Sequence, residues 1–207
     1  MDVARPYAAL VPTLDGDVLM VLAGTTRPLT GREVARLTGR RAHSGVLGVL
    51  GRLSEQGLVD RQEAGRALLY TLNRDHLAAP AVEVLADMRA ELYRRIARAI
   101  EAWALPAVHA SVFGSTARGD GDAASDIDLL ILRRQEVSAE DEAWRAQIDD
   151  LAARIRRWAG NQASIVEVGE SELCELAQTE RPILRDLRED SIILVGPPLD
   201  ALLGAPA

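Results

Sequence analysis

The sequence predicts an α+β protein whose two parts are joined by one long amphipathic helix. The pattern changes near residue 78, where short helical segments and a hairpin give way to strands that alternate with helices. The charge changes at the same point: residues 1–78 hold 10 arginines against 8 acidic residues, whereas residues 79–207 hold 14 against 23. We therefore expect a domain at 1–78, a connecting helix at 79–104, and a domain at 105–207 with a small mixed sheet flanked by helices.

Composition limits the possible chemistry. All basic residues are arginines, so no lysine is present for Schiff-base chemistry or for a lysine-dependent phosphate loop. Cys174 is the only cysteine, which excludes an intramolecular disulfide and a multi-cysteine metal site. The sequence shows no pattern typical of a secretion signal or a membrane span, and we expect a cytoplasmic protein. The net charge of −7 argues against nucleic-acid binding only if the chain is treated as uniform.

The first domain is expected to contain three short helices and a β-hairpin. The second helix can be N-capped by Thr30, and the third carries apolar residues at spacings of three and four. Two alternating segments around a turn at 64–66 indicate the hairpin. The expected elements are helices at 17–23, 30–39 and 44–56 and strands at 58–62 and 67–72.

This order of elements over residues 17–73 resembles a winged helix-turn-helix of the ArsR/MarR kind, with 44–56 as its recognition helix. Contacts with phosphates need cations, and arginines flank this helix and the hairpin. Glycines at 45, 48 and 51 provide no donors for base edges, so a winged helix used only for protein contacts is the alternative. The residues expected to contact DNA are Arg40, Arg41, Ser44, Arg52 and Arg66.

Residues 79–104 form an amphipathic stretch that we expect to connect the two domains, and a contact between two copies in a homodimer is a further option. Beyond it the pattern predicts a sheet. The expected elements are strands at 107–113, 126–132, 163–168 and 192–195 and helices at 138–159 and 170–187.

Two acidic residues on one of these strands are the main candidates for chemistry. Residues i and i+2 of a strand point to the same face, so Asp126 and Asp128 project side by side. Adjacent carboxylates repel each other unless a cation lies between them, and oxygen ligands suit Mg²⁺ or Mn²⁺. Gly114 follows an apolar strand, where it allows the backbone to approach a phosphate, and Ser115 can donate to that phosphate. Each pattern has an alternative explanation. The two aspartates also fit the exposed face of a strand, and the Gly-Ser pair also fits an ordinary turn.

Two-metal or base-assisted phosphoryl chemistry needs a third acid, and Glu167 is the candidate. This residue interrupts an apolar run on an expected strand, where a buried carboxylate is costly unless it is paired or bound to metal. An edge strand with one exposed glutamate is the alternative.

Taken together, FGSTARG at 113–119 and SDIDL at 125–129 resemble the signature of the DNA polymerase β-like nucleotidyltransferases, most closely their small prokaryotic branch, the minimal nucleotidyltransferases. Val166-Glu167-Val168 matches the third motif, with Glu where Asp is frequent. The resemblance implies catalytic, metal-binding roles for Asp126, Asp128 and Glu167, with Glu167 also the base. It implies nucleotide-binding roles for Gly114, Ser115, Arg118 and Ser125. For Arg118, a salt bridge to Asp120 or Asp122 is an equal alternative.

The resemblance implies an Mg²⁺- or Mn²⁺-dependent enzyme that transfers a nucleoside monophosphate, with ATP as the default donor, to a protein or RNA. Relatives in this branch often act as antitoxins that transfer AMP to a HEPN-type partner toxin, and a DNA-binding domain would suit autorepression. The alternative is a winged-helix transcription regulator whose nucleotidyltransferase domain senses nucleotide without catalysis. Three intact acids would argue against that alternative.

Overall fold

The computed structural model describes residues 1–39, 43–173, 187 and 190–203. The chain divides into two compact units, one formed by Arg5–Met88 and the other by Met1–Ala4 together with Arg89–Ala207. The long helix α4 (Ala79–Glu101) crosses this division. Val82 packs in the core of the first unit, whereas Leu92 and Ile96 pack in the core of the second. The amphipathic stripe seen in the sequence is therefore shared between two cores.

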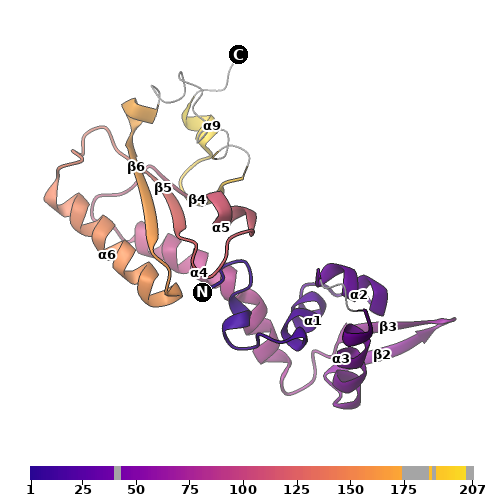
Figure 1. Cartoon of the computed structure of the whole chain (residues 1–207). Helices are drawn as coiled ribbons and strands as arrows, with labels where there is room; N and C mark the ends of the chain where they lie inside the picture. Colours follow the sequence, from indigo (N-terminus) through magenta and orange to yellow (C-terminus); the bar gives the residue numbers. More distant parts are fainter. Residues whose placement is uncertain (40–42, 174–186, 188–189, 204–207) are drawn as a thin grey trace. The chain divides into compact units, whose positions relative to one another are not determined.

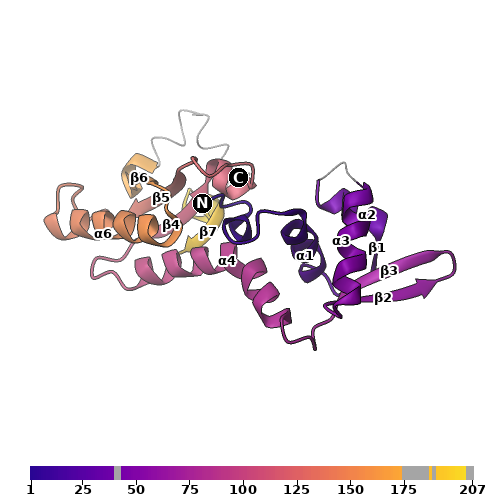
Figure 2. The same ribbon diagram turned by 60° about the horizontal axis from the view of Figure 1, so that its bottom comes forward.

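The Arg5–Met88 unit combines short helices with a small antiparallel sheet (Figures 1 and 2). The strand order is β1-β3-β2, and β2 and β3 form the hairpin that the sequence predicted. Strand β1 was not predicted, because two residues are too few to show an alternating pattern. The elements are a 3₁₀ turn (Pro6–Ala9), α1 (Leu14–Ala23), β1 (Leu29–Thr30), α2 (Gly31–Leu37), α3 (His43–Glu55), β2 (Val59–Ala64) and β3 (Ala67–Leu72).

Local sequence signals explain where these elements begin. The hydroxyl of Thr30 accepts from the amide of Glu33, and the Glu33 carboxylate accepts from the amide of Thr30, so the predicted N-cap of α2 is a full capping box. In α3, Val46, Leu50 and Leu53 are buried at the predicted spacing. The hairpin turns at Gly65, whose φ of +63° suits glycine.

The second unit is built on a four-stranded mixed sheet of order β6-β5-β4-β7. Strand β5 is parallel to β6 and antiparallel to β4, and β4 is antiparallel to β7. The mixed α+β class expected from the sequence is confirmed. The elements after α4 are β4 (His109–Phe113), α5 (Gly114–Arg118), β5 (Ile127–Arg133), α6 (Glu142–Ala159), β6 (Ala163–Gly169), β7 (Ile192–Val195) and α9 (Leu199–Leu202).

Alternate residues of β5 face two different cores. Leu129 and Ile131 lie in a core that includes residues of α4 and α6, the two helices along one face of the sheet in Figure 1. Leu130 and Leu132 lie in a separate core on the opposite face. Because both faces are covered, a polar side chain in the middle of β5 or β6 needs a partner, whereas one at a strand end can reach solvent.

Several element boundaries differ by a few residues from those predicted. Strand β4 begins at His109 rather than at 107, and α6 begins at Glu142 with Asp141 as its N-cap. Most of the helix predicted at 170–187, with Cys174, lies outside the described residues. Within the described part of the chain, no helix has the length and apolar character needed to cross a membrane.

Candidate functional site

The site begins at the tight turn that follows β4. Gly114 has a φ of +66°, a left-handed conformation that suits glycine. A Cβ atom built on Gly114 would lie only 2.6 Å from Oδ2 of Asp128. The absent side chain therefore lets the backbone of the turn approach the carboxylate of Asp128. The sequence predicted that the backbone at Gly114 comes close to a phosphate. The structure shows a close approach to the Asp128 carboxylate, and the contact with a phosphate stays a prediction.

Asp128 is held between strands on both sides. Its partner on β4 is Phe113 and its partner on β6 is Ser164. Burial raises the pKa of the half-buried Asp128, and the neighbouring carboxylate of Asp126 raises it further, while a hydrogen bond with the Ser164 side chain lowers it. Asp126 itself is exposed just before β5. The two carboxylates thus interact electrostatically, as their i, i+2 spacing predicts.

The loop between α5 and β5 brings two predicted serines together. A Cβ built on Gly121 would lie 3.1 Å from Oγ of Ser115 and 3.3 Å from Oγ of Ser125. The Ser125 hydroxyl donates to Oδ1 of Asp122 over 2.9 Å and accepts from the Asp122 amide over 2.9 Å. Donation by Ser125 lowers the pKa of Asp122, so this carboxylate stays charged. In this structure Ser125 orders the loop.

Arg118 forms the salt bridge that the sequence offered as an alternative to phosphate binding. Its Nε lies 3.2 Å from Oδ2 of Asp120, and its NH1 lies 3.5 Å from Oδ2 of Asp190. The hydrogen bond and the negative charge of Asp120 raise the pKa of Arg118. A ligand phosphate would have to share or replace these exposed carboxylates.

Glu167 is not placed to be the third acid, which corrects the sequence prediction. In the parallel register Ser164 lies beside Asp128, whereas Glu167 lies beside Ile131. Glu167 is an odd number of residues from Ser164, so its side chain points to the opposite face of the sheet. It accepts a 2.9 Å hydrogen bond from Nε of Arg133, a residue whose guanidinium also donates to the carbonyl of Val137.

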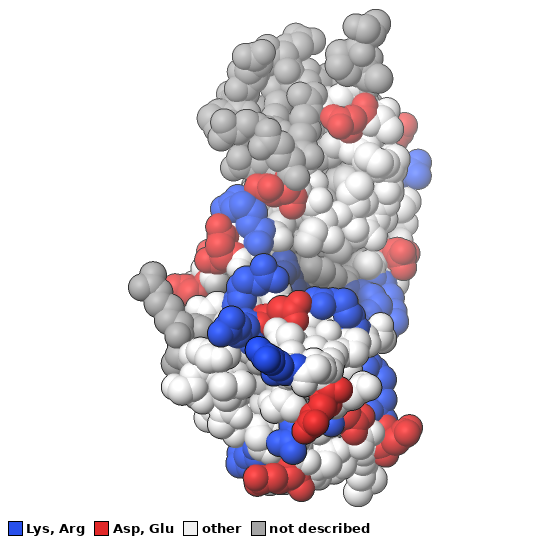
Figure 3. Space-filling view, turned by 90° about the vertical axis from the view of Figure 1, so that its right-hand side faces the viewer, with Lys and Arg blue, Asp and Glu red and all other residues white. Residues whose placement is uncertain are grey.

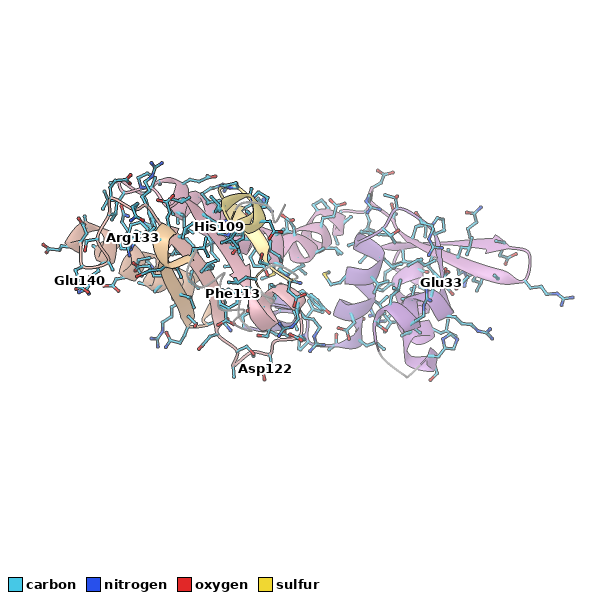
Figure 4. The ribbon with its side chains drawn as sticks, turned by 90° about the horizontal axis from the view of Figure 1, so that it is seen from above. Glu33, His109, Phe113, Asp122, Arg133 and Glu140 are labelled. Carbon is cyan, nitrogen blue, oxygen red and sulfur yellow. The ribbon has the colours of Figure 1, made fainter. Side chains whose placement is uncertain are left out.

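Figure 4 labels Arg133, the hydrogen-bond partner of Glu167. Arg133 lies well apart from Phe113 and Asp122, which flank the Gly114 turn and its loop. Glu167 therefore has a structural partner of its own, and the apolar run that it interrupts is explained by a partly buried ion pair. Of the three predicted acids, the structure brings together Asp126 and Asp128.

Three residues that support the site escaped the sequence analysis. Arg89 of α4 donates through NH2 to the carbonyls of Thr116 and Ala117, over 2.7 and 2.8 Å, and its Nε donates to Tyr93. Nδ2 of the buried Asn161 donates to the carbonyl of Ser125 over 2.8 Å. These contacts fix α5 and the loop before β5. The Tyr93 hydroxyl in turn donates to the carbonyl of Thr116 over 3.2 Å. Each of the three side chains thus reaches a carbonyl that is distant along the chain, which leaves no pattern in the sequence.

In the Arg5–Met88 unit, a cavity of about 650 Å³ lies between the start of α3 and the hairpin. Its lining includes Arg32, His43, Arg66 and Tyr70. On the face drawn in Figure 3, arginine side chains are grouped around acidic ones. Ser44 is exposed at the start of α3. The predicted Arg66 is thus joined by Arg32, which the sequence analysis did not select.

Three other arginines, Arg40, Arg41 and Arg52, were predicted to contact DNA. Arg40 and Arg41 lie outside the described residues. Arg52 forms an ion pair with Asp15 of α1, and its NH1 donates to Oε1 of Gln56 over 3.3 Å. The charge of Arg52 is therefore already paired within the unit, near the end of α3 that lies away from Ser44. This contact weakens the case for Arg52 as a DNA-binding residue.

Comparison with known families matches residues 94–187 to the model of the nucleotidyltransferase domain. The match covers less than half of the chain and contains the Gly114 turn, both aspartates and β6. No curated protein and no solved structure matches the chain significantly. The family match supports a nucleotidyltransferase, a transferase of nucleoside monophosphate groups.

Proposed function

Starting from the nucleotidyltransferase domain, we propose that the chain binds a nucleoside triphosphate between the Gly114 turn and Asp126 and Asp128, and transfers its monophosphate to a macromolecule. The observation that carries this proposal is the left-handed Gly114 packed against the Asp128 carboxylate inside the matched region. The turn at Gly114 has no side chain and so leaves room for phosphates, and the two neighbouring carboxylates can bind a cation next to them.

The donor set suits one Mg²⁺ or Mn²⁺ that arrives with the nucleotide. Mg²⁺ is usually bound through one or two carboxylates, with waters and substrate phosphates as the other ligands. Asp126 and Asp128 supply two carboxylates, whereas no cluster of three or more His, Cys, Asp or Glu residues that suits a metal occurs among the described residues. The metal, when bound, offsets phosphate charge at the reacting phosphorus. The chain itself contributes the turn at Gly114, the nearby hydroxyl of Ser115 and the two carboxylates.

We propose ATP as the donor and a protein or RNA as the acceptor. The support is the resemblance to minimal nucleotidyltransferases, whose relatives act as antitoxins on HEPN-type toxins, together with the exposure of Asp126, which a large acceptor can approach from solvent. An antitoxin role therefore belongs to this proposal. The hydroxyl of the acceptor would attack the α-phosphorus, and pyrophosphate would leave.

We also propose that the Arg5–Met88 unit is a winged helix-turn-helix that binds DNA. The support is the order of α2, α3 and the hairpin, and the cavity between α3 and the hairpin that Arg32, His43 and Arg66 line. Arginines at such a position neutralise phosphates, and binding of this kind weakens as salt rises. Arg66→Ala should weaken binding uniformly across DNA sequences, because a phosphate contact reads no base.

A second candidate function is a transcription regulator that senses nucleotide without transferring it. One observation favours it: Glu167, expected to complete an acid trio, is paired with Arg133 on the other face of the sheet. The three acids expected from the sequence therefore do not stand together, and catalysis loses that support. Helix α4 contributes residues to both units. A conformational change caused by nucleotide binding in one unit therefore has a continuous helix along which to reach the other.

The deciding experiment incubates the full chain with α-labelled ATP, Mg²⁺ and extract from the source cells. The variants are Asp128→Asn, which keeps the size of the side chain, and Glu167→Gln as the matched control. We expect label on protein or RNA with the wild type and with Glu167→Gln, and none with Asp128→Asn. Label that persists in Asp128→Asn would refute transfer at this site.

A mobility-shift assay with DNA from upstream of the gene, with and without ATP at several salt concentrations, separates the two candidates. A salt-sensitive shift that ATP alters, without any label transfer, would favour the sensor. A salt-sensitive shift together with Asp128-dependent label supports the DNA-binding enzyme. Absence of any shift would refute the DNA-binding proposal.

A further inference from the structure

Ser164 occupies the place on β6 where a third acid would have to stand. The parallel register sets Ser164 directly beside Asp128, and both side chains lie on the same face of the sheet. Neighbouring strands are about 4.8 Å apart, so a carboxylate at 164 would lie close enough to share a cation with Asp128. The next residues of β6 on this face, Val166 and Val168, are apolar. Position 164 is therefore the position on β6 from which a side chain faces Asp128.

The opposite side of Asp128 offers no room for a third acid. Phe113 is its neighbour on β4, and the next residue is Gly114, where even a Cβ would clash with Oδ2 of Asp128. Glu167 is committed to Arg133 on the far face. A third carboxylate in this sheet thus has one available position, and the chain has a serine there.

We propose that Ser164 stands in the third-acid position and acts as a positioning residue, orienting the Asp128 carboxylate in a site that binds metal–nucleotide through two carboxylates. This proposal rests on the proposed nucleotide site. The Ser164 hydroxyl has no negative charge to add to the metal, but the parallel register places it beside Asp128 on the same face, where it can orient the carboxylate. The site then binds one metal with the nucleotide and lacks a side-chain base at this position.

The proposal predicts that one substitution completes the site. Ser164→Asp should place a third carboxylate beside Asp128, and Ser164→Asn provides the control of equal size without charge. Binding of Mn²⁺, with and without ATP, is measured on the full chain from the electron paramagnetic resonance signal of the free ion. We expect Ser164→Asp to tighten Mn²⁺ binding at least tenfold, and Ser164→Asn to stay within about threefold of the wild type. Glu167→Gln should leave Mn²⁺ binding unchanged.

Thermal unfolding separates failure to fold from failure to bind. Without metal, Ser164→Asp should lower the melting temperature because like charges face each other across two strands, and Mn²⁺ should restore it. If Ser164→Asp binds Mn²⁺ no more tightly than Ser164→Asn, or if Mn²⁺ does not restore its melting temperature, the assignment is overturned. Weaker Mn²⁺ binding by Glu167→Gln would overturn it as well.

These outcomes are distinct from those of the proposed function. If the wild type binds no Mn²⁺–ATP but Ser164→Asp gains binding, the assignment of position 164 stands and the proposed nucleotide site fails. If the wild type binds Mn²⁺–ATP through Asp128 but Ser164→Asp gains nothing, the proposed site stands and the assignment fails. If neither protein binds, both are refuted.

Discussion

Replacing Gly114 by alanine tests the contact on which the nucleotide site depends. A side chain at a left-handed φ costs about 1–2 kcal/mol. The added Cβ would also lie 2.6 Å from Oδ2 of Asp128, so that carboxylate must rotate away. An off-rotamer side chain costs about 0.5–1.5 kcal/mol, which corresponds to a roughly 2- to 13-fold loss of affinity if binding must restore the original position. We expect Gly114→Ala to weaken binding of Mn²⁺–ATP by at least this factor in calorimetric titration.

Gly65→Ala is the matched control for this prediction. Gly65 has a φ of +63°, close to that of Gly114, but a Cβ there would meet no atom within 4 Å. Both variants should lose about 1–2 kcal/mol of unfolding free energy from the backbone alone. Only Gly114→Ala should lose nucleotide affinity. Equal nucleotide affinity in the two variants would show that the Gly114–Asp128 contact does not shape the site.

Three further predictions concern the supports of the fold. Arg89→Ala should lower the unfolding free energy by about 1–3 kcal/mol and weaken nucleotide binding, because the carbonyls of Thr116 and Ala117 lose their donor. Arg89→Lys has a single cationic nitrogen and should recover only part of both losses. Denaturant titration measures the stability and calorimetry measures the binding. Gly48→Ala should raise the unfolding free energy by about 1 kcal/mol in urea titration, because the added methyl meets nothing within 4 Å on α3; unchanged stability would contradict this. The amide of Thr30 lowers the pKa of Glu33 to about 2, so the stability from this cap is complete above pH 4.5 and is lost as the pH falls toward 2. Denaturant unfolding of Glu33→Gln and wild type should therefore differ at pH 6 and converge near pH 2, and a constant difference would refute the assignment.

Local patterns predicted most of the elements. The cap at Thr30, the stripe of α3 and the hairpin were readable because each depends on residues within a few positions of one another. Asp126 and Asp128 were also readable as a pair because they are two positions apart, and the charge of Asp126 does raise the pKa of Asp128. The alternation of strands and helices also predicted the small mixed sheet.

The position of Glu167 in the sheet could not be predicted from local sequence patterns. Its apolar neighbours correctly predicted a strand, but the face of the sheet that it occupies depends on the register between β6 and β5. A shift of one residue exchanges the two faces, and no residue within β6 reveals that register. The partner Arg133 is 34 positions away along the chain, and Arg89 is 27 positions from the carbonyl of Thr116 that it binds. Contacts between residues so far apart along the chain are set by the tertiary fold.

The presence of Ser164 rather than an acid changes the energetic balance of the site. Asp128 already has a raised pKa from burial and from Asp126, so a third carboxylate would add repulsion to a pair that lacks a counter-charge when no metal is bound. A serine avoids that repulsion and supplies a hydrogen bond to the charged form instead. The cost is one fewer ligand for the cation, which the nucleotide phosphates can replace. If the assignment of Ser164 holds, we expect the site to be stable without metal and to bind metal mainly together with nucleotide, so that its occupancy follows nucleotide concentration more closely than metal concentration. This dependence is required of a nucleotide sensor and is compatible with a slow transferase, so label transfer and the DNA mobility shift, rather than metal binding, separate the two functions.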